Sequence, residues 1–126
     1  MQFLLDTQIY LWLASSNARL SARTRGLLLA ADSSIYVSTA SLWEIAIKVR
    51  IGKLKANLDE LVDDLAPSGY QVVPVLPVHT IQVSRLPLLH GDPFDRMLIA
   101  QAMSEQMWLI TADAQLPQYS ELVIRV

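Results

Sequence analysis

Short and almost continuous apolar runs, separated by segments of helical period, constrain the fold of this 126-residue chain most strongly. Strands covered on one face alternate apolar and polar residues, whereas strands covered on both faces of a parallel sheet are apolar throughout. Each run therefore predicts a buried strand. The five runs are Gln2–Leu5, Ser34–Val37, Tyr70–Val73, Met107–Ile110 and Leu122–Ile124.

Apolar residues between these runs follow a helical period. They recur at i, i+3, i+4 and i+7 over Leu42–Val49, and again over Leu58–Leu65 after a capping Asn57. A third helix is predicted to begin at Asp92-Pro93, where an acid suits the cap and proline the first helical position, and to reach Ala102 or slightly beyond. Alternating strands and helices predict an α/β fold with helices on both faces of the sheet.

The length and composition predict a single domain over residues 1–126. Hydrophobic residues make up 52% of the chain, which is enough for one core without a disulfide, and cysteine is absent. Zinc ribbons and thiol chemistry are therefore excluded. No apolar stretch reaches the ~18 to 20 residues that cross a bilayer, and no secretion signal is recognisable, so we expect a cytoplasmic protein without membrane contact.

The charge is unevenly distributed although the net charge is only −2. Residues 1–56 carry seven basic and three acidic side chains, and residues 57–126 carry three basic and nine acidic ones. A basic patch can therefore coexist with an acidic site, although a solvated helix face explains the basic residues equally well. The basic residues cluster as Arg19, Arg23 and Arg25, and as Lys48, Arg50, Lys53 and Lys55.

Four acids are predicted to meet at one edge of the sheet. Asp6 follows the first strand, Asp113 follows the fourth, and Glu44 lies early in the helix after the second. Asp95 lies in the first turn of the third helix, on the same stripe as its apolar residues. Because ligands bind beyond the carboxyl ends of parallel strands, this edge is the predicted site.

Each acid also has a purely structural interpretation. Asp6 and Asp95 can cap or favour a helix N-terminus, Glu44 can complete a capping box that begins at Ser41, and Asp113 can be a loop acid. All four coinciding at one edge favours a functional interpretation. Carboxylates about 5 Å apart repel by about 3 kcal/mol per pair at an effective dielectric constant near 20. A hard cation such as Mg²⁺ or Mn²⁺ would relieve that repulsion, and such ions support phosphodiester chemistry.

Other folds with acids at strand ends fit these residues less well. A haloacid-dehalogenase-like phosphatase needs a second aspartate two residues after the first, where this chain has Gln8. A response-regulator receiver needs a lysine after a late strand, but no lysine follows Lys55. Glycine-rich phosphate loops are also absent.

Four segments resemble, in order and spacing, the PIN-domain family, and more narrowly the VapC-type toxins of bacterial toxin–antitoxin pairs. They are Leu-Leu-Asp6-Thr7, Ser-Leu-Trp-Glu44-Ile-Ala-Ile-Lys48, His90-Gly-Asp92-Pro-Phe-Asp95-Arg96-Met-Leu-Ile-Ala and Leu-Ile-Thr111-Ala-Asp113. The resemblance implies a three-layer α/β/α sandwich with a mostly parallel sheet of strand order 3-2-1-4-5. It also implies an endoribonuclease that depends on Mg²⁺ or Mn²⁺ and leaves a 3′-hydroxyl and a 5′-phosphate. Gln8 departs from the smaller polar residue that relatives often carry.

The resemblance assigns roles by position. Asp6, Glu44 and Asp95 become the central metal-binding acids, and Asp113 completes the set or holds a second metal. Thr111 orients the site by hydrogen bonding, and Thr7 and Asp92 support it, although capping explains Asp92 fully. Candidates for contacting RNA are Lys48, Arg50, Lys53 and Arg96, of which Arg96 can equally form a structural ion pair. His79 and His90 receive no ligand or catalytic role.

Two partners besides RNA follow from the same resemblance, namely a small antitoxin protein and a second copy of the chain. Trp12, Trp43 and the Leu27–Leu29 run can form an apolar groove for an antitoxin helix, or can belong to the core. Two alternative functions stay open at this point. One is a non-catalytic RNA- or partner-binding module on the same fold, and the other is a metal-dependent phosphatase.

Overall fold

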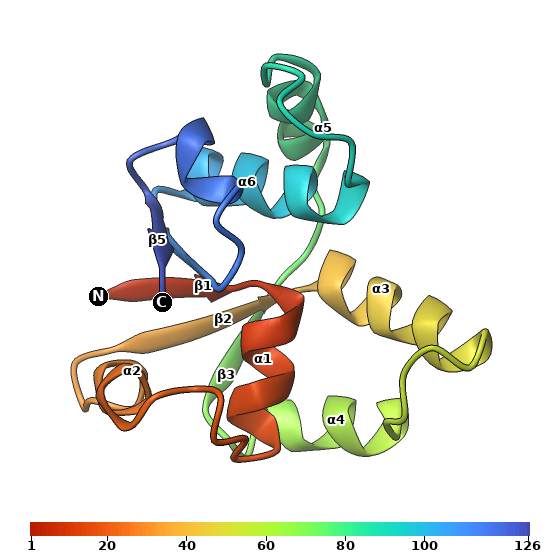
Figure 1. Cartoon of the computed structure of the whole chain (residues 1–126), viewed down its shortest axis with the longest axis vertical. Helices are drawn as coiled ribbons and strands as arrows, with labels where there is room; N and C mark the ends of the chain where they lie inside the picture. The colour runs from red at the N-terminus through yellow and green to blue at the C-terminus, as the bar shows by residue number, and fades with distance from the viewer.

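Five parallel strands form one sheet in the computed structural model, which describes residues 1–126 (Figure 1). The strand order is β3-β2-β1-β4-β5, and every neighbouring pair is parallel. The predicted order 3-2-1-4-5 and the α/β class are therefore confirmed. The last two strands begin one residue later than their apolar runs. The strands are β1 (Gln2–Leu5), β2 (Ser34–Ser38), β3 (Tyr70–Val73), β4 (Trp108–Thr111) and β5 (Val123–Arg125).

The central strand β1 is buried on both faces. Phe3, Leu4 and Leu5 have no exposed surface. Because successive side chains of a strand point to opposite faces, Phe3 and Leu5 enter one core cluster and Leu4 enters the other. This division explains why the run is continuously apolar.

Helices cover both faces of the sheet, as Figure 1 shows. One core cluster packs under α1 (Thr7–Ala14), α2 (Ala22–Leu28) and α4 (Leu58–Leu65). The other packs under α6 (Pro93–Glu105), which in turn supports α5 (Pro77–Ser84) and the 3₁₀ turn η1 (Leu116–Tyr119). The helix α3 (Thr39–Arg50) continues from the carboxyl end of β2. None of these helices combines the length and the apolarity that crossing a bilayer requires.

Two of the predicted helix starts are confirmed by their caps. The Asn57 side chain accepts a hydrogen bond from the Glu60 amide at 3.1 Å, at the start of α4. Asp92 accepts from the Asp95 amide at 2.9 Å, and Pro93 occupies the first position of α6. Both caps satisfy amides that have no partner inside the helix.

The capping box that was the alternative, structural interpretation of Glu44 does not form. The N-cap of α3 is Ser38, whose hydroxyl accepts from the Ala40 amide at 3.0 Å, so Ser41 and Glu44 both lie inside the helix.

The bounds of α1, α2 and α5 were not predicted. The helix α1 was expected only as the segment that Asp6 can cap, and α2 and α5 have a weak apolar period. Each of the latter two buries only one side chain fully, Leu28 and His79 respectively.

Candidate active site

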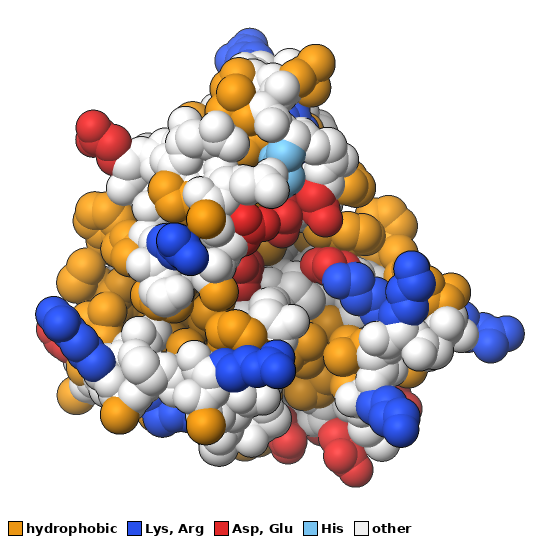
Figure 2. All heavy atoms as spheres, viewed as in Figure 1, with side chains coloured by type: hydrophobic (Ala, Val, Ile, Leu, Met, Phe, Trp, Pro, Cys, Tyr) orange, Lys and Arg blue, Asp and Glu red, His pale blue; other side chains and the backbone are white.

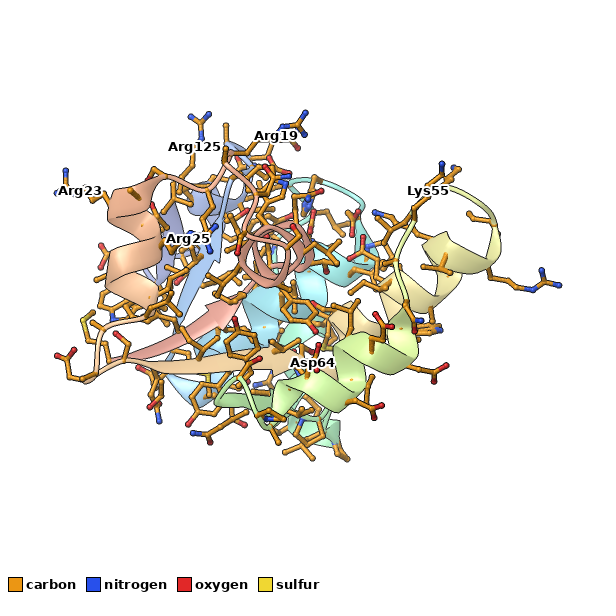
Figure 3. The ribbon with its side chains drawn as sticks, turned by 90° about the horizontal axis from the view of Figure 1, so that it is seen from below. Arg19, Arg23, Arg25, Lys55, Asp64 and Arg125 are labelled. Atoms are coloured by element: carbon orange, nitrogen blue, oxygen red, sulfur yellow. The ribbon has the colours of Figure 1, made fainter.

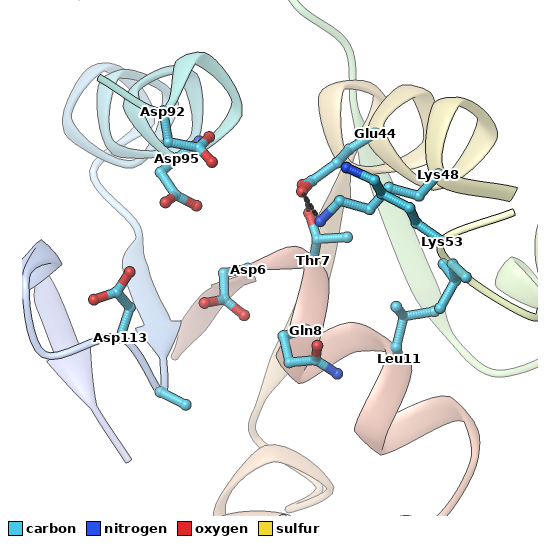
Figure 4. A pocket seen from close by; sticks show the side chains of 12 residues that line it. Asp6, Thr7, Gln8, Leu11, Glu44, Lys48, Lys53, Asp92, Asp95 and Asp113 are labelled. Atoms are coloured by element: carbon cyan, nitrogen blue, oxygen red, sulfur yellow. Dashed lines mark hydrogen bonds and ion pairs between the residues drawn. The ribbon is translucent and has the colours of Figure 1, made fainter. Parts of the chain in front are cut away.

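A pocket of about 420 Å³ opens at the carboxyl ends of β1, β2 and β4, beneath the N-terminus of α6 (Figure 4). Parallel pairing brings these strand ends to the same edge, which is where α/β folds bind ligands. Acidic side chains dominate the polar part of the wall, and two lysines lie on one side. These residues are Asp6, Glu44, Asp92, Asp95 and Asp113, with Lys48 and Lys53. The structure thus brings the four acids of the predicted site into one pocket.

Asp6 is buried at the bottom of this pocket, with 6% of its surface exposed. It caps α1, and its Oδ1 accepts a hydrogen bond from the Ile9 amide at 2.8 Å. Its Oδ2 accepts from the Thr111 hydroxyl at 2.5 Å, and the same hydroxyl oxygen accepts from the Asp113 amide at 3.0 Å. Burial raises the pKa of Asp6, the bonds from Thr111 and Ile9 oppose that rise, and the charges of Glu44 and Asp113 add to it.

Glu44 is held against α1 on the other side of the pocket. Its Oε1 accepts from the Thr7 hydroxyl at 2.6 Å, and that hydroxyl lies 3.0 Å from the Ser41 Oγ. Its Oε2 lies 2.8 Å from the Lys48 Nζ, one helical turn later (Figure 4). The hydrogen bond to Glu44 raises the pKa of Lys48, which therefore carries the positive charge that balances this acid.

Asp95 lies at the N-terminus of α6, above Asp6. Burial and the negative charge of Asp92 raise the pKa of Asp95 to about 6, while the hydrogen bond from His90 lowers it. Asp113, on the loop after β4, accepts a hydrogen bond from the Gln115 amide at 2.8 Å. Figure 4 shows the carboxylates of Asp6, Asp95 and Asp113 directed toward one another. None of these three carboxylates is paired with a lysine, so the uncompensated negative charge of the pocket is concentrated among them.

The donor set suits a hard divalent cation. The wall offers carboxylate and hydroxyl oxygens and no sulfur, which is the chemistry that Mg²⁺ and Mn²⁺ prefer. The raised pKa values of Asp6 and Asp95 indicate that a cation would lower the free energy of the ionised site. As placed, no three acidic or histidine side chains are close enough together to hold one ion. An ion held by three or more of these side chains would therefore require the carboxylates to move closer together.

Only two of the four predicted RNA contacts lie at the pocket. Lys48 and Lys53 line it, whereas Arg50 is exposed at the end of α3. Arg96 points away, since adjacent residues on a helix are about 100° apart and Asp95 already faces the pocket. Its buried guanidinium donates to the carbonyls of Pro87 at 2.8 Å and Leu86 at 3.4 Å. In this structure Arg96 therefore holds the loop before α6 through hydrogen bonds to backbone carbonyls. It does not form the structural ion pair that was the alternative to an RNA contact.

His90 received no ligand or catalytic role from the sequence, and the structure places it beside Asp95. Its Nε2 lies 3.3 Å from the Asp95 Oδ2, and its Nδ1 lies 2.6 Å from the Tyr119 hydroxyl. His90 precedes the cap of α6 by two residues, and that spacing was the only available signal. Nothing in the sequence connects it to Tyr119, 29 residues later.

A second groove, of about 480 Å³, adjoins the acidic pocket between α1, α4 and the segment before α4. The two cavities share Gln8, Leu11 and Leu54 in their walls. Arg19 and Lys55 line the groove and extend on the same side of the molecule, as Figure 3 shows. Figure 2 shows the acidic side chains gathered in a hollow with basic side chains around it.

The segments Trp12, Trp43 and Leu27–Leu29, offered either as one apolar groove or as core, do not form a single surface. Trp12 lines the groove beside α4, whereas Trp43 lines a separate apolar cavity of about 570 Å³ with Phe94. Leu28 is part of the core, as the alternative had it, and its neighbours Leu27 and Leu29 are exposed at the C-terminal end of α2. The three segments therefore belong to different parts of the fold.

The family model for the PIN domain matches residues 3–122. No curated protein sequence matches the chain. Three solved structures share its fold at low sequence identity. The VapBC2 complex from Rickettsia felis, bound to a DNA fragment from its promoter, is 19% identical with a TM-score of 0.76, and the match covers 99% of this chain and 98% of that one.

The other two structures are also toxin–antitoxin complexes. The VapBC-1 structure from nontypeable Haemophilus influenzae is 19% identical with a TM-score of 0.64, covering 94% of this chain and 91% of that one. The toxin–antitoxin complex from Klebsiella pneumoniae is 17% identical with a TM-score of 0.61, covering 96% and 94%. At these identities the likeness concerns the fold.

Proposed function

The chain belongs to the PIN-domain family, and from that premise we propose that it is a nuclease, specifically an endoribonuclease that depends on Mg²⁺ or Mn²⁺. One observation carries the proposal, namely that Asp6, Glu44, Asp95 and Asp113 lie in a single pocket at the carboxyl edge of the sheet. A cluster of acids costs folding free energy unless a cation or a proton compensates it. PIN domains are generally nucleases. The presence of this acid cluster on their fold supports a site that binds a metal ion and cleaves phosphodiester bonds.

Each residue of the pocket has a role in this proposal. Asp6, Asp95, Asp113 and Glu44 would hold the ion, which would supply charge neutralisation at the phosphate and a water of lowered pKa. Thr111 and Thr7 fix the orientation of Asp6 and Glu44 by the hydrogen bonds described above. A carboxylate of the pocket accepts the proton of the attacking water. Lys48 and Lys53 attract the RNA phosphates that the acids alone would repel.

We further propose that the chain is the toxin of a toxin–antitoxin pair. The support is its fold, which it shares with the toxin–antitoxin complexes from three bacteria. The groove between α1 and α4 offers an antitoxin segment an apolar wall, from Trp12 and Leu61, that leads to the acidic pocket through Leu11. A basic side chain on such a segment would neutralise the pocket and block the approach of RNA.

A homodimer is the third part of the proposal. Trp43 is 65% exposed, packs edge-on against Phe94 at 5.3 Å between ring centroids, and lines the apolar cavity between α3 and α6. Exposed aromatic side chains beside an apolar hollow are typical of protein interfaces. This face is separate from the groove beside α4, so a second copy and an antitoxin can bind together.

Substitution of the acids tests the nuclease directly. Asp6→Asn and Asp95→Asn keep the size of the side chain and remove its charge, so RNA cleavage with Mn²⁺ should fall by more than about 100-fold while the protein stays folded. In Asp6→Asn the amide nitrogen replaces one of the two oxygens that accept hydrogen bonds from Ile9 and Thr111, so folding is checked for this variant by circular dichroism. Glu121→Gln, at an exposed position outside the pocket, is the matched control and should cleave normally. EDTA should abolish cleavage. Full activity of either pocket variant would refute the assignment.

The same assay separates the remaining alternatives. A non-catalytic RNA-binding module would bind RNA saturably, with no effect of EDTA and no cleavage under any divalent ion. A phosphatase would hydrolyse a chromogenic phosphomonoester and lose that turnover in Asp6→Asn. Neither result is expected, because the pocket joins several acids to Lys48 and Lys53 and to a neighbouring groove lined by Arg19 and Lys55.

A further inference from the structure

The Tyr119 hydroxyl connects three segments of the chain beside the acidic pocket. It accepts a hydrogen bond from the His90 amide at 3.0 Å and another from the Arg96 Nη1 at 3.2 Å. It also lies 2.6 Å from the Nδ1 of the His90 ring. The other ring nitrogen of His90, Nε2, lies 3.3 Å from the Oδ2 of Asp95. A continuous chain of hydrogen bonds thus runs from Arg96 through Tyr119 and His90 to Asp95.

Counting donors fixes the direction of each bond. A phenolic oxygen has one proton to donate and accepts at most about two hydrogen bonds. The His90 amide and Arg96 already supply two donors, so the Tyr119 proton must be donated. Its nearest acceptor is the His90 Nδ1 at 2.6 Å, since the His90 carbonyl lies 3.5 Å away. The Nδ1 atom is therefore an acceptor, and neutral His90 carries its proton on Nε2.

The opposite end of the ring gives the same answer. If Nε2 were unprotonated, its lone pair would face the Asp95 carboxylate. Two hydrogen-bond acceptors would then meet with no hydrogen between them. A protonated Nε2 donates to Oδ2 instead. The Oδ1 atom of Asp95 receives no hydrogen bond from the protein, and Figure 4 shows this carboxylate directed into the pocket.

We propose that His90 is the positioning residue of Asp95, with its tautomer set by Tyr119, so that one carboxylate oxygen is held by the protein and the other is left for a ligand. The inference rests on the proposed function, because a metal-binding role for Asp95 is what gives this orientation its purpose. Groups that orient a metal-binding side chain through hydrogen bonds affect metal affinity without touching the metal. Arg96 contributes by holding Tyr119 from the other side.

The tautomer can be measured directly because the chain has only two histidines. In ¹⁵N-labelled, metal-free protein, the long-range ¹H–¹⁵N spectrum should show His90 protonated on Nε2 alone. Tyr119→Phe removes the donor to Nδ1, so both tautomers should become populated. Tyr36→Phe is the matched control, since that hydroxyl bonds Gln2 at the start of β1 and lies away from the pocket. Its histidine spectrum should equal that of the wild type.

A second pair of variants tests the positioning by metal affinity. A glutamine amide can replace the Nε2 donor of histidine, whereas leucine has a similar size and no donor. Calorimetry with Mn²⁺ should therefore find His90→Gln within a few-fold of the wild type and His90→Leu weaker by about 10- to 100-fold. The kcat for RNA cleavage should follow the same order, with KM for RNA unchanged.

Several outcomes would overturn the inference. These are an Nδ1-protonated or doubly protonated His90 in the wild type, an unchanged tautomer in Tyr119→Phe, or equal Mn²⁺ affinity in His90→Gln and His90→Leu. Failure of the proposed function is a different observation, namely a wild type that cleaves no RNA with any divalent ion. The tautomer measurement decides the role of His90 even in that case, because it needs neither metal nor RNA.

Discussion

At the scale of single residues, one hydroxyl organises the centre of the pocket. Thr111 has no exposed surface, donates to the Asp6 carboxylate and accepts from the Asp113 amide. It therefore joins the acid that follows β1 to the loop that carries the acid after β4. The bond also lowers the pKa of Asp6, which burial raises. A side chain of the same shape without a hydroxyl should disturb both the stability and the charge of the site.

Thr111→Val is expected to reduce the free energy of unfolding by about 2 kcal/mol, because a buried carboxylate loses a charge-assisted hydrogen bond. The pKa of Asp6 should rise further, since the stabilising bond to its ionised form is gone. Urea denaturation and NMR titration of the carboxylate measure the two effects. Thr80→Val on α5, where an exposed hydroxyl bonds the Pro77 carbonyl, should change stability by less than about 0.5 kcal/mol. Equal losses for both variants would contradict this account.

Asp95 makes the stability of the metal-free protein depend on pH. Its pKa is raised from 3.8 to about 6, so between these values the folded protein binds a proton that the unfolded chain releases. The free energy of unfolding therefore falls as pH rises through this window. The raised pKa of Asp6 acts in the same direction.

Thermal unfolding without metal should accordingly show a lower melting temperature at pH 7.5 than at pH 5. Asp95→Asn should flatten this dependence and be more stable than the wild type at pH 7.5, because the uncompensated charge is absent. Glu121→Gln should keep the wild-type slope. A wild type that gains stability between pH 5 and pH 7.5 would contradict the expectation.

At the scale of elements, the helix α6 contributes both to the pocket and to the core, through different residues. Its N-terminus presents Asp95 to the pocket, while Leu98, Ile99 and Ala102 form the core beneath the sheet. Its C-terminus ends at Gln106, which has φ 55° and ψ 51°. This left-handed conformation costs an L-residue about 1 kcal/mol and is usually taken by glycine.

Gln106→Gly should therefore raise the free energy of unfolding by about 0.5 kcal/mol, after the added freedom of glycine in the unfolded chain is subtracted. Gln115→Gly is the matched control, since Gln115 has φ −80° and gains nothing from glycine. That variant should lose up to about 1 kcal/mol. Chemical denaturation of both proteins gives the comparison, and a loss in Gln106→Gly would show that its side-chain bond to the Met103 carbonyl matters more.

At the scale of the whole molecule, three surfaces with different chemistry lie on one small domain. The acidic pocket sits at the sheet edge, the groove with Arg19 and Lys55 adjoins it, and the apolar hollow of Trp43 and Phe94 lies between α3 and α6. The apolar hollow is separate from the other two surfaces, whereas the groove and the acidic pocket share Gln8, Leu11 and Leu54.

Trp43→Lys tests the proposed homodimer. A large exposed aromatic at the centre of an interface typically contributes at least about 2 kcal/mol, so the Kd for self-association should rise by at least about 30-fold. Sedimentation or light scattering over a range of concentrations measures it. Leu29 is 57% exposed directly after α2, away from this face, so Leu29→Lys should associate like the wild type. A wild type that is monomeric at high concentration, or an unchanged Kd in Trp43→Lys, would rule out this face as the interface.

The sequence by itself determined the α/β class, the five strands and the helices after residues 38, 57 and 92. It also pointed to four of the five acids that line the pocket as its principal residues. These features depend on local properties, since burial on both faces makes a strand continuously apolar and capping needs particular residues at particular spacings. The position of Asp6 and Asp113 directly after strands was enough to predict a shared edge, because parallel strands align their carboxyl ends.

Only the tertiary structure decided which side chains meet across the pocket. Whether Arg96 faces RNA or a loop, and whether Trp12 and Trp43 share a groove, depend on how helices rotate and pack. The link between His90 and Tyr119 spans 29 residues and two elements, so no local pattern encodes it. Hydrogen bonds form between neighbours in space, and such neighbours are set by packing and not by spacing along the chain.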